Sequence, residues 1–133
     1  MAKGLEKHNE RVNALNLLGK DLSRRAKSRC ELCGASGVPL SIHECEPAPK
    51  EPDFDSCLMV CSTCADGMKS IDKSETHHWR NLDEAIWSET PVIQVQSVRI
   101  LRAIESRCDW VPPMLEYLTL DPEIESWINK ARI

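Results

Sequence analysis

Two Cys-x-x-Cys pairs, Cys30 with Cys33 and Cys61 with Cys64, constrain this chain more than any other feature of its sequence. Two residues between the cysteines of a pair allow one tight turn to direct both sulfurs at a metal about 2.3 Å away. Residues 34–60 separate the pairs, a span somewhat longer than the commonest zinc spacing but short enough for a single hairpin. The sequence therefore predicts a tetrahedral site in which these four cysteines bind one Zn²⁺.

Such a site predicts a structural role for the metal. Four thiolates fill the coordination sphere of zinc and leave no open position for water or substrate. Folding of the surrounding module should then depend on the metal. A thioredoxin-like redox motif is the alternative interpretation of either pair alone, but two pairs without a preceding buried strand pattern favour zinc.

The cysteine content also bears on the cellular compartment. Seven is an odd number, and residues 1–7 are charged and lack the apolar core of a secretory signal. In a reducing compartment, paired Cys-x-x-Cys is more typical of metal binding than of disulfides. With 41% hydrophobic and 29% charged residues, and no apolar stretch approaching the roughly 20 residues that span a bilayer, the sequence predicts a globular cytoplasmic protein with no membrane contact.

The other three cysteines have no role that their spacing defines. Cys45 and Cys57 flank the predicted hairpin and could supplement the zinc site or hold a second metal with His43. Packing as small buried hydrophobic residues is the simpler interpretation. Cys108 has no ligand partner nearby in the sequence and is also expected to pack.

The net charge of −4 hides an uneven distribution of charged residues. Residues 1–30 contain eight Lys/Arg and three Asp/Glu, a balance of +5, which leaves −9 for the rest of the chain. Lys20, Arg24 and Lys27 share one helical face just before the first cysteine pair. A solvated helix end is the simpler explanation, and contact with nucleic-acid phosphates is the functional one. An unidentified protein partner is the remaining interpretation.

The hydrophobic pattern predicts an α+β fold in three parts. Residues 1–28 form an amphipathic helix, residues 29–70 a small Cys₄ zinc module, and residues 77–133 a mostly helical C-terminal region. Within the module, Leu40–Glu44 and Leu58–Val60 are expected to pair as a β-hairpin. The expected helices are residues 5–27, Trp79–Trp87, Pro91–Ser106, Val111–Leu118 and Pro122–Ala131, and residues 71–76 are expected to be a linker.

Several single residues carry further expectations. The apolar face of the first helix should consist of Val12, Leu15, Leu18, Leu22 and Ala26. Thr90 and Asp121 each precede a proline and should cap the helices that follow. The tryptophans are expected to anchor the core or the contact between regions, at Trp79, Trp87, Trp110 and Trp127.

The two cysteine pairs differ in the residue that follows them. Gly34 follows Cys33, as in a zinc knuckle, whose chain turns through a left-handed conformation. No glycine follows Cys64, which suits the N-terminus of a helix, where N–H groups stabilise thiolates. A knuckle, a hairpin and a ligand-bearing helix describe a treble clef. The treble clef is favoured over a zinc ribbon. The zinc ribbon remains an alternative, because Gly67 would weaken the ligand-bearing helix that a treble clef requires.

A further set of motifs occurs in order along residues 20–130. It consists of Cys30-Glu31-Leu32-Cys33-Gly34, the second Cys-x-x-Cys, His78-Trp79-Arg80-x-Leu82, Trp87, Pro91-Val92-x-Gln94-Val95, Arg99-x-Leu101, Trp110 and Leu120-Asp121. This set resembles the PhnA-like family, a bacterial group named after a gene in an alkylphosphonate-uptake operon. The resemblance implies a zinc-ribbon-type module that binds zinc through the four paired cysteines.

The sequence also departs from that family. Members typically continue into an SH3-like β-barrel, for which these residues contain no counterpart. No set of residues suits cleavage of a carbon–phosphorus bond, so the operon name implies no phosphonate chemistry here. A saturated Cys₄ site without a convincing catalytic group predicts a binding or interaction module.

An HNH nuclease is the enzymatic alternative. In HNH nucleases, which resemble this arrangement of cysteine pairs, a strand histidine acts as the general base and Asn and His residues hold a divalent metal. His43 occupies the position of the base. Ala65 replaces the usual histidine after the second pair, and residues 53–58 contain no asparagine. This alternative therefore predicts a nucleic-acid-binding protein with degenerate or residual nuclease activity, in which His43 is the one catalytic candidate.

Overall fold

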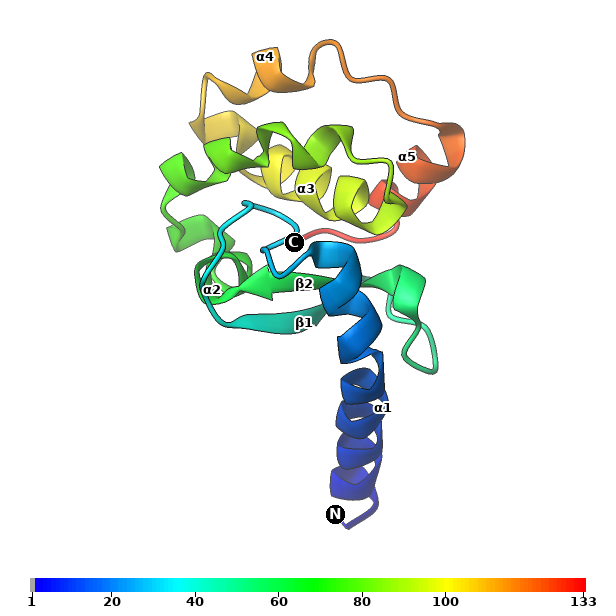
Figure 1. The fold of residues 1–133 in the computed structure, drawn as a ribbon. Helices are drawn as coiled ribbons and strands as arrows, with labels where there is room; N and C mark the ends of the chain where they lie inside the picture. Colours follow the sequence, from blue (N-terminus) through cyan, green and yellow to red (C-terminus); the bar gives the residue numbers. More distant parts are fainter. Residues whose placement is uncertain (1) are drawn as a thin grey trace.

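The computed structural model describes residues 2–133, which form helices and one small antiparallel sheet (Figure 1). The α-helices are α1 (Ala2–Ala26), α2 (Ser62–Lys69), α3 (Pro91–Ile104), α4 (Val111–Leu115) and α5 (Pro122–Asn129). The strands are β1 (Leu40–Glu44) and β2 (Cys57–Cys61), and the 3₁₀ segments are η1 (Phe54–Ser56), η2 (Ile71–Lys73), η3 (Thr76–Asp83), η4 (Ala85–Trp87) and η5 (Glu105–Arg107). The predicted mixture of helices with a small sheet is confirmed. None of the helices within residues 2–133 is long and apolar enough to cross a membrane.

The apolar contact between helix α1 and the sheet involves the C-terminal half of the helix. The buried and half-buried residues of this contact are Leu15, Leu18, Leu22 and Ala26, as the periodicity predicts. Val12 is 39% exposed, because the first half of α1 extends away from the rest of the molecule (Figure 1). The helix ends where Lys27 and Ser28 take positive φ angles of 55° and 60°, which turn the chain out of the right-handed helix.

Strand β2 is buried on both faces. Successive side chains of a strand point to opposite sides. Cys57 and Met59 therefore join the cluster under α1, whereas Leu58 and Val60 join the main core. The antiparallel register places Ile42 of β1 opposite Met59. Both predicted strands are present, and β2 is the wall shared by the two clusters.

Helix α3 is the centre of the C-terminal half. It contacts α4, α5 and the 3₁₀ segments η2, η3, η4 and η5, as the apolar residues around its circumference predict. Its buried apolar residues are Val92, Ile93, Val95, Val98, Ile100, Leu101 and Ile104. Pro91 and Pro122 begin their helices as expected, but neither Thr90 nor Asp121 caps through its side chain.

The predicted helical segment Trp79–Trp87 is present as the 3₁₀ helices η3 and η4 rather than as an α-helix. Trp79, Leu82 and Ala85 are buried and recur every three residues, which matches the period of a 3₁₀ helix rather than 3.6. Trp87 lies off this buried face and is 54% exposed. It therefore does not anchor the core, whereas Trp79 does.

The expected linker at residues 71–76 is also partly ordered. Ile71 is buried within η2, and Arg107 donates hydrogen bonds to the carbonyls of Ile71 and Asp72. This segment is consequently tied to η5, the 3₁₀ helix that follows α3.

Gly67 sits inside α2, and its place there has a steric reason. A Cβ built at this position would lie 2.6 Å from Cζ2 of Trp79, a ring that is 1% exposed. The glycine thus allows the tryptophan to pack directly on the backbone of α2. This contact brings the C-terminal region against the segment that carries the second cysteine pair.

Replacing Gly67 by alanine should destabilise the protein by about 1–3 kcal/mol, because the overlap with a buried ring outweighs the better helix propensity of alanine. Gly19→Ala is the matched control, since a Cβ in α1 would meet only Ile42 Cδ1 at 4.0 Å and should stabilise by about 0.5–1 kcal/mol. Urea unfolding of the zinc-loaded variants measures whether each substitution raises or lowers the free energy of unfolding. Stabilisation by both substitutions would contradict the packing argument.

Candidate metal centre

The first cysteine pair lies on a tight turn that directly follows α1. The Cys30 carbonyl accepts a hydrogen bond from Gly34 N–H at 2.9 Å, and Cys30 N–H donates to the Ala35 carbonyl at 2.9 Å. Gly34 has a φ of +79°, the left-handed conformation that glycine adopts without steric cost. The turn brings Cys30 and Cys33 to the same side, and Cys33 N–H lies 3.5 Å from Cys30 Sγ as a donor.

The second pair lies where β2 becomes α2. Cys61 is both the last residue of β2 and the N-cap of α2, and its Sγ accepts from Cys64 N–H at 3.5 Å. Cys64 is in the first turn of α2, where unpaired N–H groups favour negative charge. The sequence has no glycine after Cys64 and predicts a helix start there. The strand–helix junction at the second pair agrees with that prediction.

Each sulfur of the first pair lies close to a sulfur of the second pair. The Sγ atoms of Cys30 and Cys64 are 3.7 Å apart, and those of Cys33 and Cys61 are 3.6 Å apart. All four Sγ atoms lie within 4.8 Å of one another. A tetrahedron with metal–sulfur bonds of about 2.3 Å has edges of about 3.8 Å. The four predicted ligands are therefore brought together with a geometry compatible with one zinc ion.

Three of these thiols, those of Cys30, Cys33 and Cys64, differ in the pKa at which they lose their protons. The hydrogen bond between the Cys30 and Cys64 sulfurs lowers the pKa of Cys30 to about 4, and the same bond raises the pKa of Cys64. Burial raises the pKa of Cys33 to about 11. Thiolates are the metal-binding form of cysteine, so binding of a cation would release protons from the thiols that still hold them.

A buried ion pair holds the first turn in place, and no pattern in the sequence predicted it. Glu31, whose side chain is 3% exposed, pairs with Arg25 at 2.8 Å. The Glu31 carboxylate also accepts from Met59 N–H at 2.9 Å, and Arg25 donates to the Cys57 carbonyl at 2.7 Å. Arg25 belongs to the basic run before the first pair, but it is engaged rather than solvated.

His78 is a second residue that sequence reasoning missed. Its Nε2 lies 3.2 Å from Cys64 Sγ, and against a thiolate this nitrogen can act only as a donor. Such hydrogen bonds lower the charge density on a ligand sulfur and orient it. The only signal was the His77-His78 doublet beside Trp79, which lacks the spacing of a ligand to this site.

The remaining cysteines pack rather than bind metal. Burial raises the pKa of both Cys45 and Cys57 to about 11, so both stay neutral thiols, and Cys108 is 5% exposed. Cys45 Sγ receives a hydrogen bond from Arg99 at 3.4 Å. Within residues 4–133, no second group of three metal-binding side chains forms, with or without His43.

No family model matches the chain, and no curated protein or solved structure shows significant similarity to it. A function must therefore be inferred from the chemistry of the residues themselves.

Replacing His78 by alanine should weaken zinc affinity about tenfold, because partners outside the first coordination sphere typically contribute 10- to 100-fold. His77→Ala is the control, since His77 is the exposed neighbour and makes no contact with the four sulfurs. Competition with a chromophoric chelator gives both affinities. Equal affinities for the two variants would remove His78 from the metal centre.

Proposed function

We propose that this chain is a zinc-binding protein in which one structural Zn²⁺ organises a treble-clef module. The observation that carries the proposal is the spacing of the sulfurs, 3.6 and 3.7 Å across the two pairs, which fits a tetrahedral Zn–S₄ site. Four thiolates saturate the ion, so the proposed role of the metal is to stabilise the fold. The protein's own role is then binding or interaction, with an unidentified partner.

The treble clef, rather than a zinc ribbon, is supported by the unequal settings of the two pairs. Cys30 and Cys33 lie on a glycine-containing turn. Cys61 and Cys64 lie at a strand–helix junction, where a ribbon would have a second turn of the first kind. The hairpin of β1 and β2 connects the two settings.

Membership of the PhnA-like family is part of the proposal. Its support is the ordered motif set in the sequence, and several of those motif residues have contacts that bind the C-terminal region together. Trp79 packs on Gly67, Gln94 donates to the Ile86 carbonyl at 2.8 Å, and Arg99 is 4% exposed. The motifs are thus interpreted as features that preserve a fold.

Cys61→Ser should reduce zinc content from about one ion per chain to less than a tenth, and the module should lose its fold, because metal binding and folding are coupled. Cys108→Ser is the control, because Cys108 is a buried cysteine outside the site. This variant should keep its zinc, and its free energy of unfolding should fall by about 1–3 kcal/mol. Metal analysis and circular dichroism measure these outcomes. A fully loaded, normally folded Cys61→Ser protein would reject the proposal.

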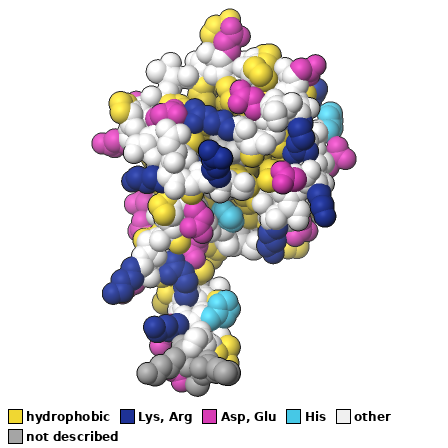
Figure 2. Space-filling view, turned by 180° about the vertical axis from the view of Figure 1, so that it is seen from behind, with side chains coloured by type: hydrophobic (Ala, Val, Ile, Leu, Met, Phe, Trp, Pro, Cys, Tyr) yellow, Lys and Arg dark blue, Asp and Glu magenta, His cyan; other side chains and the backbone are white. Residues whose placement is uncertain are grey.

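Nucleic-acid binding is the second candidate function. Lys20 and Arg24 are exposed near the end of α1 and Lys27 is exposed directly after it. The one ion pair among them, Arg24 with Asp21 at 3.7 Å, is itself solvated. Surface pairs of this kind contribute little, so these cations remain available to phosphates. Figure 2 shows Lys and Arg side chains along the projecting part of the molecule.

Any catalysis in this second candidate would centre on His43. His43 lies half-buried on β1, burial lowers its pKa, and it lines a cavity of about 340 Å³ together with Ala65. Ala65 offers no metal-binding atom where an HNH nuclease has a histidine. We therefore propose binding with at most residual cleavage. Mg²⁺-dependent nicking that His43→Ala abolishes would instead make the protein an enzyme.

The triple variant Lys20→Gln, Arg24→Gln and Lys27→Gln should lose most of its affinity for duplex DNA or RNA. The salt dependence of binding should flatten by about one unit of slope for each phosphate that the variant no longer neutralises. A control variant changes Lys50, Lys73 and Lys130 to Gln and carries the same net charge. Gel shifts over a salt series compare the two. Identical binding curves, or no binding by the wild type at low salt, would eliminate this function.

A further inference from the structure

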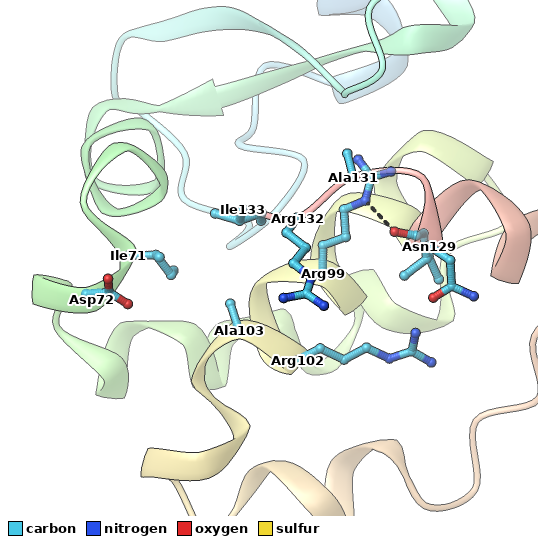
Figure 3. Close-up of a pocket in the computed structure, with 10 residues that line it drawn as sticks. Ile71, Asp72, Arg99, Arg102, Ala103, Asn129, Ala131, Arg132 and Ile133 are labelled. Carbon is cyan, nitrogen blue, oxygen red and sulfur yellow. Dashed lines mark hydrogen bonds between the residues drawn. The ribbon is translucent and has the colours of Figure 1, made fainter.

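A cavity of about 470 Å³ lies beside α3, bounded by η2 and by residues 128–133 (Figure 3). Its volume falls in the range of small-molecule sites, roughly 300–1,000 Å³. Its apolar lining comes from Ile71, Ala103, Ile128, Ala131 and Ile133, and its polar lining from Asp72, Arg99, Arg102, Asn129 and Arg132. It is separate from the metal centre, because none of the four paired cysteines lines it.

Hydrogen bonds from α3 and its extension hold both walls of this cavity. On one side, Arg107 donates to the Ile71 carbonyl at 2.9 Å and to the Asp72 carbonyl at 3.2 Å. On the other, the buried Arg99 donates to the Ile128 carbonyl at 3.1 Å, the dashed line in Figure 3, and to the Trp127 carbonyl. These carbonyls belong to the last turn of α5, where Lys130 N–H also donates to the Trp127 carbonyl at 3.1 Å. The cavity is consequently preformed.

Two further guanidinium groups border the open space. Arg102, on α3, pairs with Glu125 through its Nη atoms at 2.9 and 3.3 Å. The Nε–H of Arg102 takes no part in this pair and can donate to a ligand. Arg132 extends from the final residues toward α3 on the same side as Arg102 (Figure 3). Within residues 4–133, no hydrogen bond or ion pair engages the Arg132 side chain. The one acidic side chain that lines the cavity is Asp72.

We propose that this cavity binds a small organic anion. Its apolar part would contact Ile71, Ala103 and Ile128, and its anionic group would accept hydrogen bonds from Arg132 and Arg102. The Arg132 guanidinium group has five N–H donors, and no acceptor within residues 4–133 engages them. Guanidinium groups bind oxyanions through paired, charge-assisted hydrogen bonds. The apolar floor selects a molecule with a hydrophobic body over a bare inorganic anion. Anion binding here is independent of the function proposed for the metal.

A pair of fluorescent probes that differ only in charge tests the proposal on the zinc-loaded protein. The anionic probe is 8-anilinonaphthalene-1-sulfonate, and the neutral probe is N-phenyl-1-naphthylamine, the same ring system without the sulfonate. We expect wild-type protein to bind one sulfonate probe per chain at this cavity. Absence of any binding by the wild type would overturn the proposal.

Arg132→Gln should raise the Kd of the sulfonate probe about tenfold, the effect of removing one charge-assisted hydrogen bond, and leave the Kd of the neutral probe unchanged within about twofold. Lys130→Gln is the matched control, because it removes a charge from the same exposed segment without lining the cavity. Equal effects of Arg132→Gln and Lys130→Gln on the sulfonate probe would overturn the assignment of Arg132.

Ala103→Phe places a ring in the cavity and should abolish binding of both probes. Far-UV circular dichroism and metal content establish that this variant is folded. If it does not fold, Ala131→Phe fills the same space from the opposite wall. Undiminished probe binding by a folded, filled variant would show that the probes bind elsewhere, and would reject the site.

Discussion

The convergence of four cysteine sulfurs is the constraint on which the rest of the fold depends. The sulfurs come from a turn after α1, from the end of β2 and from the first turn of α2. Thiolates 3.6–3.7 Å apart repel one another unless a cation lies between them. The hairpin between the two pairs is short and has only two strands, and such a hairpin is marginal in water by itself. Its order therefore relies on the elements packed around it and, in the function proposed above, on the metal.

The C-terminal region is not a passive addition to this centre. It contributes His78 to Cys64 and packs Trp79 against the backbone of α2 at Gly67. One hydrophobic cluster runs from Cys30 and Leu32 to Ile124 and Ile128. Strain in α2 would consequently be felt both at the sulfurs and in the core around α3, because close-packed interiors transmit displacement.

Local patterns predicted much of this structure. The cysteine spacing predicted that these four cysteines converge, and periodicity predicted α1, α3, α5 and both strands, since these signals depend on neighbours in the sequence. The ion pair of Arg25 with Glu31 was not predicted, because its value comes from contacts with β2 that only the folded chain creates. His78 escaped for the same reason.

The segment from Trp79 to Trp87 failed differently. A spacing of three fits one turn of either an α-helix or a 3₁₀ helix, and Trp87 was expected to anchor the core or the contact between regions. Sustained over Trp79, Leu82 and Ala85, the period is that of the tighter helix. The sequence contained the signal, but tertiary packing under α3 decided between the two periods.

The edge of β2 illustrates what the first cysteine turn protects. Glu31 N–H donates to the Met59 carbonyl at 2.8 Å, and its carboxylate accepts from Met59 N–H, so the turn covers the strand edge that β1 leaves unpaired. The strand, Cys57-Leu58-Met59-Val60-Cys61, carries no charge and no proline. If the turn detached with the metal, this edge would be free to pair with the same strand of another molecule. Metal loss would then be a route to self-association through added β-strands.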